Sequence, residues 1–169
     1  MPKAVFVDEN DNVIGAGTPR EAREKGIRHR IVRIFLLNAK GELLIQKRSE
    51  NVVSNPNKWD HSAAGHVDEG EDYETAAYRE LKEEVGVEGI PLREVTRYYM
   101  EETDEKEIKK RFNALYRGIY DREMILDRRE VSEVKWVKLD ELLAWIERRP
   151  EDFTQSFIYG LKEFLKFQK

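Results

Sequence analysis

The chain has 169 residues, of which 40% are apolar and 38% are charged. This length fits one domain spanning residues 1–169, and the apolar fraction excludes a disordered chain. Lysine and arginine number 30 against 34 aspartates and glutamates, for a net charge of −4, which argues against duplex DNA as a partner. Because there is no cysteine, disulfides, thiolate catalysis and cysteine-ligated zinc are also excluded.

The N-terminal segment turns acidic at Asp8 and lacks the apolar stretch of a signal peptide. No segment approaches the roughly 20 apolar residues that span a bilayer. We therefore expect a cytoplasmic protein without a membrane partner.

The first elements are expected to be a small hairpin and a short helix. The hairpin pairs Ala4–Val7 with Asn12–Gly15 across a turn-forming cluster. Thr18 and Pro19 are typical of a helix start, and this helix should end near Gly26.

Two strands follow, at 29–37 and 42–48, and their apolar runs are typical of strands covered on both faces by helices. Residues 49–58 carry Asn51, Ser54, Asn55, Pro56 and Asn57 and therefore predict a loop. Residues 59–67 predict one short strand that leads into a further loop.

A helix is predicted over 71–85. Its apolar stripe, Ala77, Leu81 and Val85, recurs every four residues, and acidic residues crowd its first turn, where the helix dipole favours them. Gly86 stands where a left-handed glycine ends a helix.

The last third of the chain predicts three strands and two helices. The strands are expected at 92–101, 109–120 and 134–137. One helix runs from Asp140 to about Arg148, where Pro150 ends it. The final amphipathic helix is expected to carry Phe153, Phe157, Leu161, Phe164 and Leu165.

Three glutamates on the helix at 71–85 are the first candidates for chemistry. Glu80, Glu83 and Glu84 have i, i+3, i+4 spacing and share one helix face, where each like-charge pair destabilises the helix by about 0.2–0.5 kcal/mol. Carboxylate oxygens are suitable ligands for Mg²⁺ or Mn²⁺, and such a cation would offset the repulsion. Spacing alone leaves a solvated acidic face as the alternative.

The wider pattern is more specific. It consists of Gly65, five residues, Glu71, seven residues, and then Arg79-Glu80-Leu81-Lys82-Glu83-Glu84-Val85-Gly86-Val87. The pattern is a complete match to the signature of the Nudix hydrolase family. This resemblance implies the family's fold, an α/β/α sandwich with a mixed sheet.

The resemblance also implies a reaction and a site. Nudix hydrolases cleave a diphosphate linked to another group, usually a nucleoside derivative, and use Mg²⁺ or Mn²⁺. Carried onto this chain, the metal ligands are Glu80, Glu83, Glu84 and the Gly65 carbonyl. Arg79 joins the glutamates in the catalytic set as an organiser of carboxylates that pairs with Glu71, and Gly86 is structural. Cations held in this way let an acidic protein bind an acidic substrate.

Three further segments resemble the Nudix branch that contains type I isopentenyl diphosphate isomerase: Leu36–Leu44, Lys47–Arg48 and Trp59–His66. That enzyme shares the fold but moves a double bond, and it needs a cysteine immediately before its Gly-His pair. This chain has Ala64 there, and it has Glu80 where the isomerase carries arginine. Both differences favour a hydrolase.

The same branch adds lower-ranking candidates. His66 resembles a metal-binding histidine, Glu105 and Glu107 resemble acidic metal ligands, Arg48 resembles a diphosphate-contacting arginine, and His29 resembles another position of that site. Each has a plain structural alternative: a hydrogen-bonded loop histidine, an exposed hairpin tip, a strand-end charge or a strand-edge histidine.

The sequence therefore predicts a metal-dependent diphosphohydrolase that acts on a small phosphorylated substrate by water attack on phosphorus. One alternative is a non-catalytic Nudix binding or regulatory module, although such modules usually lose a signature glutamate and none is lost here. Another is an isomerase-type enzyme, which Ala64 disfavours. A homodimer is compatible with the family, but no segment identifies an interface.

Overall fold

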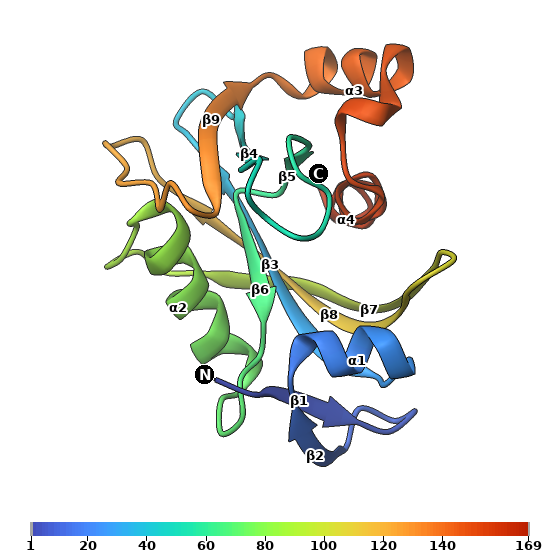
Figure 1. Ribbon diagram of the computed structural model, residues 1–169. Helices are drawn as coiled ribbons and strands as arrows, with labels where there is room; N and C mark the ends of the chain where they lie inside the picture. Colours follow the sequence, from blue (N-terminus) through green and yellow to red (C-terminus); the bar gives the residue numbers. More distant parts are fainter. Residues whose placement is uncertain (1, 169) are drawn as a thin grey trace.

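A computed structural model of the chain describes residues 2–168. Its strands are β1 (Ala4–Val7), β2 (Val13–Gly17), β3 (His29–Leu37), β4 (Leu43–Arg48), β5 (Trp59–Asp60), β6 (Ala63–His66), β7 (Arg93–Thr103), β8 (Ile108–Ile119) and β9 (Val131–Val137). Its helices are α1 (Pro19–Lys25), α2 (Tyr73–Val85), α3 (Leu139–Arg148) and α4 (Gln155–Leu165), with a 3-10 turn at Pro150–Asp152. Figure 1 shows these elements arranged around β3.

The strand β3 organises a mixed sheet. Along one edge it pairs in parallel with β8 over its whole length. Along the other edge it pairs antiparallel with β6 from Ile31 to Ile34 and touches β4 only at Leu37. Beyond that point β4 turns away to pair with β5 and β9. The sheet is therefore split between β6 and β4.

Ser62 bridges this split. Its hydroxyl accepts a hydrogen bond from the Leu36 backbone N–H at 2.8 Å and donates one to the Leu44 carbonyl at 2.6 Å. A single buried side chain thus supplies the backbone partners that a continuous ladder between β3 and β4 would have provided.

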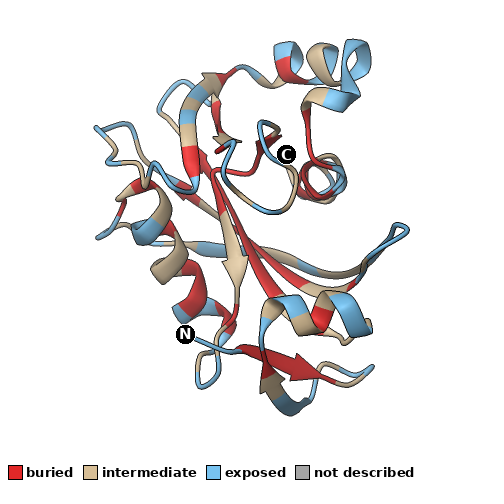
Figure 2. Ribbon diagram, viewed as in Figure 1, coloured by how far each residue is buried: buried red, intermediate tan, exposed pale blue. Residues whose placement is uncertain are grey.

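Successive residues of β3 face two different cores, because side chains alternate along a strand. Val32, Ile34 and Leu36 pack with the apolar stripe of α2. Phe35 packs instead with α3 and α4, whose buried residues include Leu142 and Phe157. This arrangement confirms the predicted α/β/α sandwich with a mixed sheet, and Figure 2 shows the buried strands between the half-exposed helices.

The structure corrects three predicted boundaries. The strand expected at 59–67 is divided into β5 and β6, because Ser62 turns inward at the split. The helix expected from 71 begins at Tyr73, since Asp72 is its N-cap and accepts a hydrogen bond from the Thr75 N–H. Phe153 lies before α4 rather than on it.

The boundary of α4 has a clear local cause. Thr154 is its N-cap, and its hydroxyl accepts a hydrogen bond from the Phe157 N–H at 3.0 Å. Phe153 still belongs to the same core, because its ring stacks on Phe157 at 5.4 Å between centroids. Phe153 therefore matches the apolar spacing of α4 and is buried with it, although it is not part of the helix.

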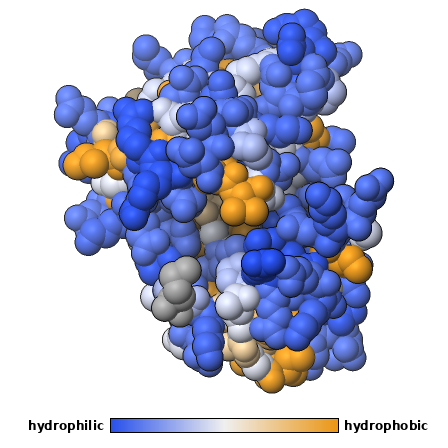
Figure 3. All heavy atoms as spheres, viewed as in Figure 1, coloured by the Kyte–Doolittle hydropathy of each residue, from blue (hydrophilic) through white to orange (hydrophobic). Residues whose placement is uncertain are grey.

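The surface is dominated by polar side chains. Figure 3 shows one mostly hydrophilic face with small hydrophobic patches, as a 38% charged composition requires. Within residues 2–168, no helix is both long enough and apolar enough to cross a membrane.

Gly86 provides a test of how α2 is ended. Its φ is +70°, and a Cβ there would lie 2.8 Å from the Ile125 carbonyl oxygen. We expect Gly86→Ala to cost more than the roughly 1–2 kcal/mol of a left-handed alanine, since the Ile125 backbone must also move. Gly41→Ala is the matched control, because Gly41 has φ of +77° and nothing within 4 Å of the added Cβ. Urea unfolding should show the larger loss at Gly86, and equal losses would contradict this account.

Candidate functional site

The helix α2 presents its carboxylates beside the stripe that anchors it. Ala77, Leu81 and Val85 are completely buried against the sheet and fix the rotation of the helix. Glu80 and Glu84 flank this stripe and are partly buried, whereas the Glu83 side chain is 57% exposed. The three glutamates therefore share one side of the helix but differ in their contact with solvent.

Glu84 reaches the split in the sheet. Its Oε1 accepts hydrogen bonds from Gln46 Nε2 at 2.8 Å and from the Ala64 N–H at 3.1 Å. These donors come from β4 and β6, so the carboxylate links the two sides of the split. Burial, followed by the charge of Glu80, raises the pKa of Glu84 well above its usual range.

Glu80 lies against β6. A Cβ at Gly65 would overlap the Glu80 carboxyl group, so only glycine allows this approach. Burial raises the pKa of Glu80, and the charge of Glu83 acts in the same direction, while Arg79 opposes both. Arg79 Nη1 donates to Glu80 Oε1 at 2.8 Å.

Arg79 is the centre of an acidic network. Its guanidinium forms a two-point pair with Glu71, at 2.7 Å from Nε to Oε2 and 2.9 Å from Nη2 to Oε1. Nη1 also lies 3.2 Å from Glu83 Oε2, and Nη2 donates to the His66 carbonyl at 2.9 Å. Nη2 is 3.2 Å from Asp68 Oδ2 as well. These partners raise the pKa of Arg79 and hold the loop before α2 against the helix.

The donor set suits a hard divalent cation. Among residues 2–168 there is no group of three acidic or histidine side chains already arranged around one point, because Glu83 leans toward Arg79. Glu80 and Glu84, however, form a close pair whose burial and mutual repulsion disfavour two negative charges. A divalent cation relieves that repulsion, and carboxylate oxygens match Mg²⁺ or Mn²⁺.

The hairpin candidates lie elsewhere. Glu105 and Glu107 flank the turn between β7 and β8, which Figure 1 shows on the opposite side of the molecule from α2. Glu105 is exposed, and Glu107 Oε1 lies 3.3 Å from Arg23 Nε of α1. The structure therefore does not bring these two residues to the glutamates of α2.

The remaining candidates gather on the other face of the sheet. The rings of His29 and His66 stack with their centroids 5.5 Å apart. Burial lowers the pKa of His29 to about 4 and lowers that of His66 as well, so both rings are neutral. Arg48 Nε donates to the Ser54 carbonyl at 2.9 Å, and its Nη1 lies 3.6 Å from Asp60 Oδ2.

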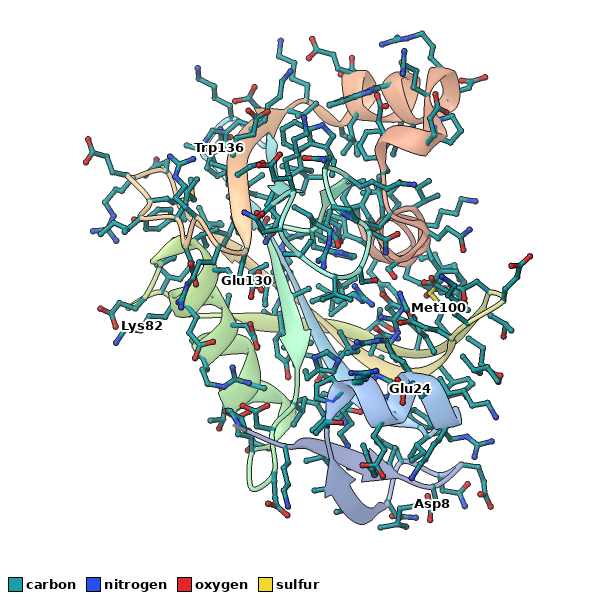
Figure 4. The ribbon with its side chains drawn as sticks, in the orientation of Figure 1. Asp8, Glu24, Lys82, Met100, Glu130 and Trp136 are labelled. Atoms are coloured by element: carbon teal, nitrogen blue, oxygen red, sulfur yellow. The ribbon has the colours of Figure 1, made fainter. Side chains whose placement is uncertain are left out.

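Three residues of this site were not predicted from the sequence. Gln46 is 4% exposed and directly follows the apolar run Leu43–Ile45 of β4, and a polar residue at this place in a predicted strand was a usable signal. Asp68 contacts Arg79 from inside the signature loop, at a position the signature leaves open. Glu130, before β9, has a charge that raises the pKa of Glu84. Figure 4 shows Glu130 on the side of α2 that faces β6, and Lys82 on its outer side.

Comparison with known proteins agrees with this geometry. The NUDIX domain family matches residues 27–157. A protein of Photorhabdus laumondii named isopentenyl-diphosphate Delta-isomerase 2 is 36% identical over 90% of this chain and 86% of its own length. An uncharacterized Nudix hydrolase of Yersinia pestis is 33% identical over 95% of this chain and 84% of its own length.

Solved structures support the same assignment. The crystal structure of DR0079 from Deinococcus radiodurans has a TM-score of 0.79 and 25% identity, and the match covers 96% of this chain and 99% of that one. The NUDIX domain of Shewanella oneidensis NrtR, solved with ADP ribose, shares the fold at a TM-score of 0.62 and 17% identity, over 81% and 88% of the two chains. The chain belongs to the NUDIX domain family, in the subgroup that includes proteins named isopentenyl-diphosphate isomerase, and is a hydrolase of pyrophosphate bonds.

Proposed function

We propose that the chain is a metal-dependent diphosphohydrolase that cleaves a nucleoside diphosphate-linked or related substrate by water attack on phosphorus. The observation that carries this proposal is the buried Glu80–Glu84 pair, held beside the sheet by Gln46, Ala64 and Arg79. The proposed metal ligands are Glu80, Glu83, Glu84 and the Gly65 carbonyl.

The chain's own residues have distinct parts in this scheme. Bound Mg²⁺ or Mn²⁺ would neutralise phosphate oxygens and lower the pKa of a water molecule. Glu84 is held by Gln46 and Ala64, and Glu80 by Arg79, in the positions proposed for metal ligands. Arg79 orients Glu80 and ties it to Glu71, so it is a positioning residue rather than a contact to the diphosphate.

The intact glutamate set supports catalysis over a non-catalytic binding module, since binding alone does not require all three carboxylates. The relatives named as Nudix hydrolases in Yersinia pestis and Pseudomonas aeruginosa point the same way. A nucleoside diphosphate-type substrate is supported by the NrtR structure, which contains ADP ribose. The direct test is phosphate or nucleotide release from a panel of diphosphate-containing compounds with Mg²⁺ or Mn²⁺.

Isomerase activity is the second candidate because several relatives carry that name. The structure gives Ala64 a different part: its N–H anchors Glu84, and it has no side chain that exchanges protons. The chain contains no cysteine that could replace the missing thiol.

We expect no conversion of isopentenyl diphosphate into dimethylallyl diphosphate, because the thiol is absent. Product analysis after incubation with Mg²⁺ measures this directly. Ala64→Cys is an informative companion variant, since it restores the group while leaving the backbone N–H to Glu84 in place. Turnover of the unmodified chain at enzyme-like rates would show that the hydrolase proposal is wrong.

Glu84→Gln should reduce metal-dependent hydrolysis by more than the roughly 10–100-fold that is typical for losing a residue that only supports a ligand. The amide keeps an oxygen to accept from Gln46 and Ala64 and removes one of two repelling charges. The metal-free melting temperature should therefore hold or rise. Lys82→Gln is the control, because Lys82 pairs with exposed Glu88 on the outer side of α2. Full turnover in Glu84→Gln would rule out its proposed part.

Metal binding should also stabilise the fold without any substrate. At a cation concentration ten times Kd, the stabilisation is about 1.4 kcal/mol, which raises the melting temperature by about 3–5 °C for a domain of this size. Mn²⁺ should act at a lower concentration than Mg²⁺. Glu84→Gln should reduce both shifts and Lys82→Gln should leave them intact. If neither ion shifts the melt, even with a non-hydrolysable diphosphate analogue present, the metal site does not exist.

A further inference from the structure

A second charged cluster lies on the face of the sheet that α4 covers. It contains three buried cations from neighbouring strands, Arg33 of β3 and Lys109 and Arg111 of β8. Arg33 is 3% exposed, Lys109 is 8% exposed, and the Arg111 side chain is 12% exposed. Arg111 Nη2 lies 3.2 Å from the Ser156 hydroxyl, which places the cluster beneath α4.

These cations have few anionic partners. Arg33 Nε donates to Asn113 Oδ1 at 2.8 Å, its Nη2 has no hydrogen-bond partner, and no carboxylate of residues 2–168 lies within 4.0 Å of the guanidinium. Lys109 Nζ donates only to the neutral Ser54 hydroxyl, at 2.9 Å, among the described residues. Arg111 pairs with Glu102 at 3.0 Å, but its Nε is also unpartnered.

The surrounding charges leave an excess of positive charge. The cations of this region include Arg23, Arg33, Arg48, Lys109 and Arg111, and the acids are Asp60, Glu102, Glu107 and Glu163, the last of which pairs with Lys166 at 2.8 Å. Asp60 is already engaged by His61 at 2.7 Å, and Glu107 by Arg23. Burial, followed by the charge of Arg33, lowers the pKa of Arg111 to about 10, although the charges of Glu102 and Asp60 oppose this shift.

The cluster does not fit a metal ion. His29 and His66 lie beside it, but the carboxylate that would complete such a site, Glu107, is paired with Arg23 instead. Buried cations without counter-ions are unfavourable, and an anion that reached them would form strong charge-assisted hydrogen bonds.

The position of the cluster relates it to the carboxylates of α2. In the antiparallel register of β3 and β6, Arg33 lies directly opposite Ala64, whose N–H anchors Glu84. One strand therefore separates the cationic cluster from the metal-binding glutamates, and the two occupy opposite faces of the sheet beside its split. A small molecule that contacts both clusters would have carboxylate oxygens, suited to a metal ion, at one end and guanidinium groups at the other.

We propose that Arg33, Lys109 and Arg111 bind a second anionic group of the substrate, a phosphate or a carboxylate on the part that is not the cleaved diphosphate. This inference rests on the proposed function for the identity of the ligand. The anion takes the free Arg33 and Arg111 donors and replaces Ser54 as the partner of Lys109. The preferred substrates are thus diphosphates whose other half carries its own negative charge.

Binding is tested first without catalysis. Inorganic phosphate and, in a parallel arm, succinate are titrated in EDTA, and the melting temperature is followed at constant ionic strength. We expect a saturable rise with at least one of the two anions, and the arm that responds identifies the chemical class. Arg33→Gln and Arg111→Gln should weaken the response at least fivefold. Arg20→Gln removes an equal charge from an 81% exposed side chain and should have no effect.

The melting temperature of each variant without anion shows whether that variant folds. Arg33→Gln removes an uncompensated buried charge, so its own melting temperature without anion should hold or rise, and Arg33→Lys should retain part of the response. No response in the wild-type chain, or an equal response in Arg33→Gln, would overturn the proposal.

A second measurement separates this site from the proposed function. Glu84→Gln should keep the anion response in EDTA while losing hydrolysis. For paired diphosphate substrates with and without a terminal phosphate on the non-cleaved half, KM should be at least tenfold lower for the phosphorylated one, and Arg33→Gln should abolish that difference. If the chain binds the anion but cleaves no diphosphate, the anion site stands and the proposed hydrolase function is wrong. If the chain is a hydrolase with equal KM values for the two substrates, the proposed anion site is wrong.

Discussion

The split in the sheet is the constraint on which the rest of the site depends. β3 cannot pair with β6 and β4 at the same residues, so one edge of β3 is shared between them and Ser62 supplies the missing backbone contacts. At Gln46, β4 pairs with β5 and β9 rather than with β3, and the side-chain amide of Gln46 donates to Glu84. A continuous β3–β4 ladder would have closed the position that this carboxylate occupies.

Arg79 balances the charge that gathers at this position. It contacts Glu71, Glu80 and Glu83 within 3.2 Å and also holds the His66 carbonyl. Its positive charge favours ionised carboxylates, whereas burial of Glu80 and Glu84 favours the neutral form. Without a further cation the two tendencies remain in conflict. Binding of the proposed cation would therefore be coupled to the stability of α2 through the same side chains.

Local periodicity explains what could be predicted from the sequence. The glutamate spacing, the apolar stripe of α2 and the left-handed Gly86 depend only on residues within one helix, and all three lie where expected. The contact from Gln46 to Glu84 spans 38 residues and depends on the departure of β4 from β3. The pair between Arg23 and Glu107 spans 84 residues and displaces a carboxylate that local resemblance had assigned elsewhere.

Arg33 shows that the net charge of the chain does not describe the local charge beside the candidate site. A net charge of −4 describes an acidic protein, yet the strand next to the acidic pair carries a buried guanidinium with no carboxylate partner among the described residues. Alternation along β3 places Arg33 on the face away from α2, while pairing with β6 places it opposite Ala64. The negative charges of Glu80 and Glu84 therefore lie on one face of the sheet, and the positive charge of Arg33 lies on the other. Under the proposed anion site, a substrate that contacts both clusters would be selected by the separation of its charges as well as by their number.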